Sequence, residues 1–206
     1  MKNFNILFIL CVFFIGIFYS SILSQQETIE ESSTGKIFPK EVSFNYKGDD
    51  YNLTATGTAV RKKFIFKVYG MVHYMQNAPS GSSKEIFSAI LKDNYAKQIT
   101  MDFTRNVGAD KIKDAFQSGF TKNASKEELA NIQPLINQFL EYFNSEVKKN
   151  EQYILRWLPS GTVISIIQGT EYPPISDVTF ARVLWTIWFG NDSIVNRNDL
   201  ISLLVK

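Results

Sequence analysis

The chain has 206 residues, a formal net charge of +2, one histidine and one cysteine. So balanced a charge gives no indication of a nucleic-acid partner, and the one dense basic cluster, Arg61-Lys62-Lys63, is too short to follow a phosphate backbone. Because the cysteine is Cys11, near the N-terminus, the rest of the chain can form neither an internal disulfide nor a thiolate metal site. The common metal-binding and nucleotide-binding motifs are absent, so we expect no metal and no cofactor.

The first 24 residues are typical of an export signal. Lys2 precedes an apolar run from Ile6 to about Tyr19, and small or polar residues follow up to Ser24. These are the three parts of a secretory signal peptide, and the run is shorter than the roughly 20 apolar residues that span a bilayer. We expect cleavage after Ser24, export to the periplasm or the extracellular space, and no stable membrane span afterwards. An uncleaved N-terminal anchor is the alternative.

Residues 25–39 are mostly polar and predict a flexible linker, followed by one domain over residues 40–206. Near Val42, two runs of alternating apolar and polar residues flank Gly48-Asp49-Asp50 and predict a β-hairpin. From Thr58 to Met75, β-branched and aromatic residues predict one long strand.

The second half of the chain alternates between helical and extended patterns. In order, these patterns predict a helix after the capping box Ser82–Glu85, a strand over 99–104, a helix from Ala109, a helical region from Ser125 to Val147 that Pro134 kinks or splits, a hairpin of 153–158 and 162–168, a helix from Asp177 to Gly190, and a short helix over 198–205. This succession predicts an α+β domain, in which a mainly antiparallel sheet is covered by helices on one face.

His73 lies within the long predicted strand and has no carboxylate beside it in the sequence. Catalytic triads and most zinc sites need a histidine that other groups orient. We therefore interpret His73 as a structural residue, and no residue stands out as a confident catalytic candidate. On the same strand, one parity carries Arg61, Lys63, Lys67, Tyr69 and His73. That face is either open to solvent or a partly covered cleft with a cationic group beside apolar walls.

Four segments resemble, in the expected order, those of the chalcone isomerase-like family. They are the run from Gly57 through Arg61 and Tyr69 to Tyr74, then Ile99–Arg105, Trp157–Thr162 and Phe180–Gly190. The resemblance covers about residues 40–205 and is closest to the short bacterial members and the fatty-acid-binding members. It implies an open-faced β-sandwich of chalcone isomerase type, with a large antiparallel sheet under a layer of helices.

The family contains enzymes and binding proteins. The enzymes are intramolecular lyases that close a chalcone to a flavanone, whereas other members bind fatty acids through an arginine and a tyrosine. Arg61 matches the family arginine, and Tyr69 falls where the binders resemble this chain in having tyrosine. The enzymes' catalytic tyrosine has no counterpart in residues 107–111, and Gln117 stands near the place of their asparagine. The resemblance thus favours binding of a fatty acid or similar small acidic amphiphile over catalysis on a chalcone-like or other aromatic enone.

Physical chemistry supports Arg61 as the anion anchor, because a guanidinium matches a carboxylate with two parallel hydrogen bonds and stays charged. Tyr69 can add a third bond. On a straight strand the two residues would lie roughly 26 Å apart, at about 3.3 Å per residue. They can share a site only if the chain turns between them. A third possibility, a non-catalytic partner of another envelope protein, would be favoured by a sealed cleft around Arg61. The oligomeric state is left open.

Overall fold

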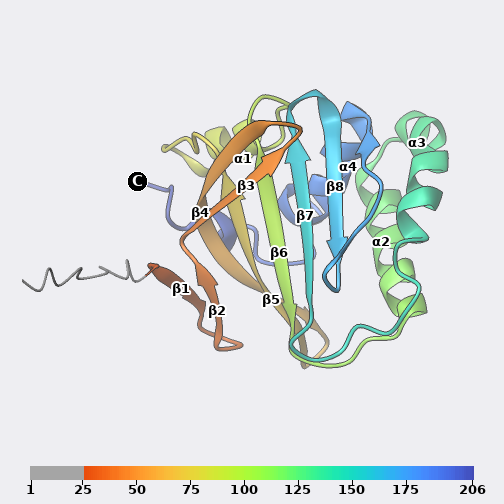
Figure 1. Cartoon of the computed structure of the whole chain (residues 1–206), viewed down its shortest axis with the longest axis horizontal. Helices are drawn as coiled ribbons and strands as arrows, with labels where there is room; N and C mark the ends of the chain where they lie inside the picture. Colours follow the sequence, from red (N-terminus) through yellow and green to blue (C-terminus); the bar gives the residue numbers. More distant parts are fainter. Residues whose placement is uncertain (1–25) are drawn as a thin grey trace, which may run out of the picture.

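The computed structural model of the chain describes residues 26–206, so the predicted signal peptide lies outside the described residues. This part contains one large antiparallel sheet with the strand order β10-β8-β7-β6-β5-β4-β3, and β9 pairs with β8. Figure 1 shows the long central strands side by side. The strands are β3 (Glu41–Tyr46), β4 (Asp49–Lys63), β5 (Phe66–Met75), β6 (Lys97–Phe103), β7 (Gln152–Leu158), β8 (Thr162–Ile167), β9 (Thr170–Glu171) and β10 (Ile175–Ser176).

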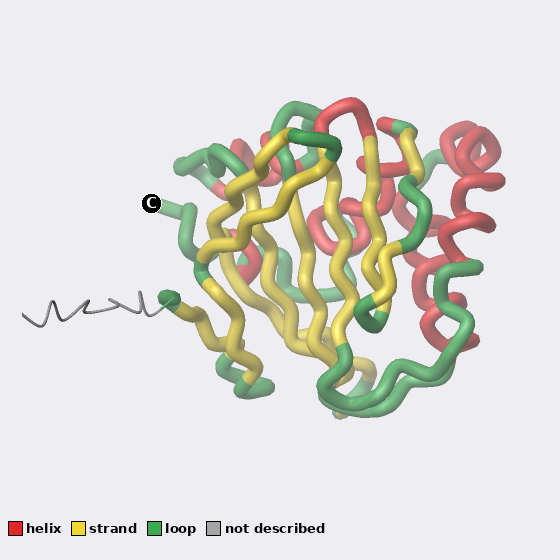
Figure 2. Tube along the Cα trace, viewed as in Figure 1, coloured by secondary structure: helices red, strands yellow, loops and turns green. Residues whose placement is uncertain are grey.

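The helices gather on one side of this sheet (Figure 2). Within residues 26–206 they are α1 (Ser83–Ile90), α2 (Ala109–Asn123), α3 (Lys126–Leu140) and α4 (Val178–Phe189). The helix α4 is the central one, since nine of its twelve residues are buried. None of these helices is long and apolar enough to cross a membrane. The arrangement confirms the predicted α+β class and the layer of helices over an antiparallel sheet.

The helix starts follow from local signals in the sequence. The Ser125 side chain accepts a hydrogen bond from the Glu128 backbone N–H at 3.2 Å, and the Glu128 carboxylate accepts one from Ser125 N–H at 2.8 Å. This reciprocal pair satisfies two donors that a helix start leaves free. Asp177 begins α4 in the same way by accepting from Phe180 N–H at 2.7 Å. Each of these predicted caps is confirmed.

Two clusters of apolar side chains pack on the two faces of the sheet. The larger cluster fills the space between the sheet and the helices, and the smaller one covers the opposite face around Val72, Tyr74 and Leu53. Because side chains alternate along a strand, β5 contributes to both clusters. Met71 belongs to the larger cluster and Val72 to the smaller one. The central strands are therefore buried on both faces.

The structure differs from the flexible linker expected over 25–39. Strands β1 (Thr28–Glu31) and β2 (Lys36–Pro39) form a separate two-stranded hairpin. The Glu31 carboxylate holds its turn by accepting from the backbone N–H groups of Ser33 and Thr34. Phe38, which is 1% exposed, packs into the cluster on the outer face of the sheet. One buried aromatic ring in a polar segment is too weak a periodic signal to predict a strand.

Two helical predictions are also corrected. The helix α3 runs through Pro134 without splitting, because Ile132 and Ile136 on either side of it are buried in the core. It then ends at Leu140 instead of Val147. At the C-terminus the expected helix over 198–205 is a single 3₁₀ turn, Asp199–Ile201.

The stretch Thr58–Met75 is two strands and not the one that its composition predicts. It forms the end of β4 and all of β5, and a turn at Phe64 and Ile65 joins them. Turns between strands normally carry Gly, Asn, Asp or Pro. Because this turn has none of these residues, its sequence gives no sign that the chain reverses.

Candidate ligand-binding site

The turn after β4 brings Arg61 and Tyr69 together. They are direct cross-strand partners in the β4–β5 ladder, and such partners lie about 4.5–5.5 Å apart and point to the same face. That face is the helix-covered one, since Ala59 and Met71 beside them belong to the larger buried cluster. The condition for a shared site, a turn between the two residues, is met.

Tyr69 is buried against α4, where the indole Nε1–H of Trp188 donates a hydrogen bond to the Tyr69 hydroxyl at 3.1 Å. Burial raises the pKa of Tyr69 to about 12, and the hydrogen bond from Trp188 and the charge of Arg61 only partly oppose this rise. The phenol is therefore neutral at any physiological pH. Within residues 26–206 its own proton is donated to no acceptor.

Arg61 is half-buried, and its Nη1 donates to the backbone carbonyls of Ile194 and Lys62, at 2.8 Å each. In the described part of the chain, its Nε and Nη2 donate no hydrogen bond and no carboxylate forms an ion pair with it. The guanidinium thus keeps one edge of donors and has no counterion among the described residues.

Aromatic rings pack around Tyr69 on the buried side of the pair. Phe103 contacts Tyr69 edge to face, with ring centres 5.4 Å apart, and Phe116 contacts Trp188 in the same way at 6.1 Å. Phe143, which follows α3 in the chain, stacks on Phe116 with ring centres 4.9 Å apart. We call these five residues, Tyr69, Phe103, Phe116, Phe143 and Trp188, the aromatic cluster.

Residues 190–198, here named the post-α4 segment, cover Arg61. Four hydrogen bonds fasten this segment to the end of α4. The donors and acceptors are Gly190 N–H to Thr186 O at 2.8 Å, Ile194 N–H to Ile187 O at 3.0 Å, Ser193 Oγ to Trp188 O at 2.6 Å, and Arg197 Nη1 to Phe189 O at 3.0 Å. The last carbonyls of a helix have no partner within the helix. Their need for donors explains why the segment lies here.

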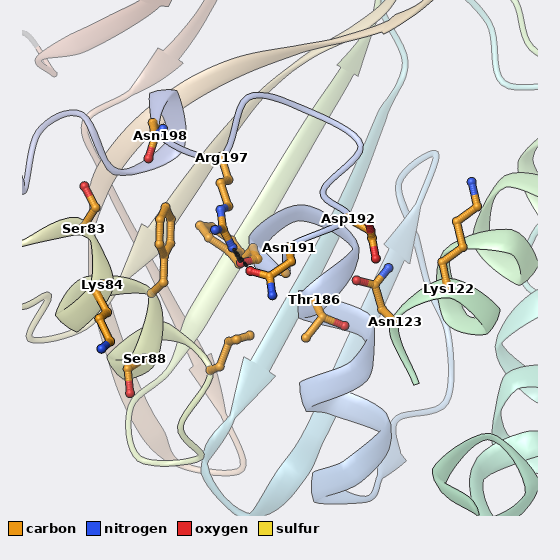
Figure 3. A pocket seen from close by; sticks show the side chains of 14 residues that line it. Ser83, Lys84, Ser88, Lys122, Asn123, Thr186, Asn191, Asp192, Arg197 and Asn198 are labelled. Atoms are coloured by element: carbon orange, nitrogen blue, oxygen red, sulfur yellow. Dashed lines mark hydrogen bonds between the residues drawn. The ribbon is translucent and has the colours of Figure 1, made fainter. Parts of the chain in front are cut away.

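A hollow of about 650 Å³ opens on the other part of this segment, between α1 and the ends of α2 and α4 (Figure 3). Phe87 and Phe189 contribute apolar surface to it, and its polar residues include Lys84, Lys122, Asn123, Asn191, Asp192 and Arg197. Arg197 lies over the ring of Phe87 at 4.5 Å and donates to Asn191 at 3.2 Å. Neither Arg61 nor Tyr69 lines this hollow.

His73 is fully buried and has a structural role, as the sequence indicates. Its Nδ1 lies 2.7 Å from the Thr56 hydroxyl, which also lies 2.7 Å from the Leu200 carbonyl. Since a hydroxyl has one proton and a carbonyl can only accept, Thr56 donates to Leu200 and accepts from Nδ1–H. Burial lowers the pKa of His73 to about 3, so the ring is neutral. Within residues 26–206, no three His, Cys, Asp or Glu side chains are placed to hold a metal ion.

Trp188 and Ile194 are the site residues that the sequence does not reveal. Their contacts with Tyr69 and Arg61 span 119 and 133 residues, so no local pattern encodes them. In the sequence, Trp188 belongs to the apolar helix pattern and to the family-like segment Phe180–Gly190, but neither pattern indicates a contact with Tyr69. Gln117, compared above with the enzymes' asparagine, hydrogen-bonds to Thr121 of its own helix α2.

Comparisons with known proteins support this fold. The family model of the chalcone isomerase-like proteins matches residues 32–198, whereas a search of curated proteins finds no match. A crystal structure of a fatty-acid binding protein from Arabidopsis thaliana is similar with a TM-score of 0.69 and 16% identity, over 85% of this chain and 96% of that one. At this identity the likeness shows a common fold. Because the family model covers most of the sequence and the architecture agrees with it, the chain belongs to the chalcone isomerase-like family.

Proposed function

We propose that the chain binds a fatty acid or a similar small acidic amphiphile, with Arg61 as the anchor for its carboxylate. The pairing of Arg61 with Tyr69 on the helix-facing side of the sheet carries this proposal. Arg61 supplies a charge and an edge of unused donors, and Tyr69 supplies a neutral hydroxyl with an unused proton. A carboxylate accepts several charge-assisted hydrogen bonds at once and fits both groups.

The aromatic cluster supplies apolar contact for the rest of such a ligand. Ligand sites are mostly apolar, with a few polar groups that fix orientation. In this structure the cluster is closely packed, and the carbonyl of Ile194 already accepts a hydrogen bond from Nη1 of Arg61. The Nε–Nη2 edge of Arg61 is free for a carboxylate, but the apolar part of a ligand needs space, which the post-α4 segment provides by moving away from Arg61, as loops that cover binding sites commonly do.

Two observations support a non-catalytic role. The similar Arabidopsis thaliana protein is described as a fatty-acid binding protein. Residues 107–111, where the resembling enzymes have their catalytic tyrosine, contain none here.

The test is lipid extraction and mass spectrometry of the purified protein, followed by titration with a fluorescent fatty acid. Arg61→Ala is expected to weaken affinity at least about tenfold, since a hydrogen bond to a charged group contributes about 1.5–3 kcal/mol. Arg156→Ala is the matched control, because this arginine lies on the opposite face of the sheet, over the ring of Phe44 and hydrogen-bonded to Gln98. No ligand in the extract, together with equal affinity of wild type and Arg61→Ala, contradicts the proposal.

A second candidate is a non-catalytic partner of another envelope protein, favoured by one observation: the Ile194 carbonyl and the post-α4 segment cover Arg61. The titration separates the two candidates, because a partner protein of this kind needs no fatty-acid affinity.

We also propose that the protein is exported. This rests on the residues before Gln25. N-terminal sequencing of the mature protein should begin at Gln25, and retention of Lys2 would contradict cleavage.

A further inference from the structure

The turn between β4 and β5 exposes three consecutive large apolar side chains. Phe64 is 88% exposed, Ile65 86% and Phe66 53%. We call these three residues the hairpin tip. Scattered exposed apolar residues are ordinary, but a contiguous group of them marks a contact surface.

The tip residues do not serve the turn itself. The ladder runs to the pair Lys63 and Phe66, so Phe64 and Ile65 form a two-residue loop. Phe64 has φ of 55°, the left-handed region in which Gly, Asn or Asp is favoured and a bulky residue is strained. A phenylalanine here neither packs on the protein nor suits the backbone. This points to a requirement outside the folded domain.

Basic residues flank the tip. Lys62, Lys63 and Lys67 are exposed on the two strands, and the guanidinium of Arg105 lies 4.8 Å from the ring centre of Phe66. The sequence has no acidic residue between Asp50 and Glu85, so the hairpin carries no Asp or Glu beyond Asp50. The Lys67 ammonium donates to the Ser33 carbonyl, which keeps its positive charge near the tip.

We propose that the hairpin tip inserts into an anionic lipid surface. Phe64 and Ile65 enter the boundary between headgroups and acyl chains, and the flanking bases bind the anionic headgroups. Aromatic and aliphatic residues with basic neighbours bind membranes in this way, and each base near an anionic surface adds to the attraction. Charge complementarity and the convex shape of the tip favour a lipid surface, which needs no preformed pocket, over a protein partner. This contact is independent of the proposed ligand site.

A flotation assay with lipid vesicles tests the proposal. The apolar run 6–19 of the full chain would bind vesicles by itself, so the protein tested should begin at Gln25, the expected mature N-terminus. Every strand of the sheet and both buried clusters lie within residues 26–206, so this form keeps the contacts that hold the domain together. Binding is expected to phosphatidylcholine vesicles that contain phosphatidylglycerol, to fall as salt is raised, and to be much weaker for phosphatidylcholine alone.

The double variant Phe64→Asn with Ile65→Ser should reduce vesicle affinity at least about tenfold, since it removes two apolar side chains from the membrane. It should stay folded, because asparagine suits the positive φ at position 64. Leu203→Ser is the matched control: Leu203 is 54% exposed at a distant point of the sequence and should not affect binding. Reversing two charges with Lys62→Glu and Lys63→Glu should also cost at least about tenfold.

Insertion itself is measured with Ile65→Trp. The native Trp157, Trp185 and Trp188 are buried and give a constant background. The new indole should shift to shorter emission wavelength with anionic vesicles and be quenched by brominated acyl chains. No vesicle binding by the wild type, or binding that the tip variants leave unchanged, overturns the proposal. Self-association that the tip variants abolish, without vesicle binding, would assign the tip to a second copy of the chain and overturn it too.

Discussion

The ammonium of Lys97 lies 4.2 Å from the ring centre of Trp157 and is fully buried. Lys97 donates to the carbonyls of Lys92 and Tyr95, at 2.7 and 2.8 Å. Beside them the Asp93 carboxylate accepts from Trp157 Nε1–H, at 2.8 Å, and from the backbone of the β7–β8 turn. A buried lysine therefore ties the loop before β6 to the sheet, at an electrostatic cost.

This cost predicts that stability rises at mildly alkaline pH. Burial lowers the pKa of Lys97 from 10.5 to about 8, although the charge of Asp93 opposes the shift. Between these values the unfolded chain holds more protons than the folded one, so the free energy of unfolding increases with pH, by at most about 1.4 kcal/mol per unit. Urea unfolding at pH 8, 9 and 10 should show this slope. Lys97→Met should abolish it, and an equal slope in both proteins would assign the effect to other groups.

His73 predicts a second pH dependence of the unfolding free energy, this time on the acid side. Burial lowers its pKa from 6.5 to about 3, so between these values the unfolded chain again binds more protons. The stability contributed by keeping this ring neutral is complete above pH 6.5 and is lost as the pH falls toward 3. In His73→Gln, urea unfolding curves between pH 7 and 4 should depend less on pH than in the wild type. A variant with the same acid dependence would show that carboxylates dominate it.

At Gly57 the backbone of β4 packs so closely against the C-terminal 3₁₀ turn that there is no room for a side chain. A Cβ on this residue would overlap the Asp199 carbonyl oxygen and lie 2.6 Å from the Leu200 carbonyl carbon. Gly57→Ala should therefore cost about 2 kcal/mol or more, typical of forced overpacking, measured as a lower urea midpoint. Gly108→Ala is the control, because no atom lies within 4 Å of a Cβ there; it should change stability by less than about 1 kcal/mol. Equal costs would disprove the close approach.

Tyr69→Phe separates the structural role of the site from its binding role. The change leaves the indole N–H of Trp188 buried without its acceptor, which costs about 1–3 kcal/mol. It also removes one donor to a bound carboxylate, so fatty-acid affinity should fall less than in Arg61→Ala. Differential scanning calorimetry and the fluorescent titration measure the two effects. Unchanged thermal stability would contradict the Trp188 contact, and unchanged affinity would remove Tyr69 from the ligand site.

Sequence patterns predict most of this fold because its strongest signals are local. The caps at Ser125 and Asp177 are short-range hydrogen bonds, and each falls where the spacing indicates. The β1–β2 hairpin escapes prediction because its main anchor, Phe38, is buried in a cluster whose other fully buried members lie at Leu53 and beyond.

The site is harder to predict for a related reason. The family resemblance identifies Arg61 and Tyr69 as candidates. Their distance is overestimated from the sequence, because Phe64 and Ile65 are not typical turn residues and the reversal of the chain is missed. Trp188 and Ile194, which contact this pair, lie more than 100 residues later in the chain, at separations of 119 and 133 residues. Only the folded topology places them beside the pair.

The post-α4 segment belongs to two sites at once. Its Ile194 carbonyl holds Arg61, while its Asn191, Asp192 and Arg197 line the hollow. Any displacement that frees the Arg61 guanidinium also reshapes that hollow, so occupancy at one place is thermodynamically linked to occupancy at the other. A molecule that fills the hollow and fixes this backbone would thereby set the affinity of Arg61 for an anion, without touching the arginine.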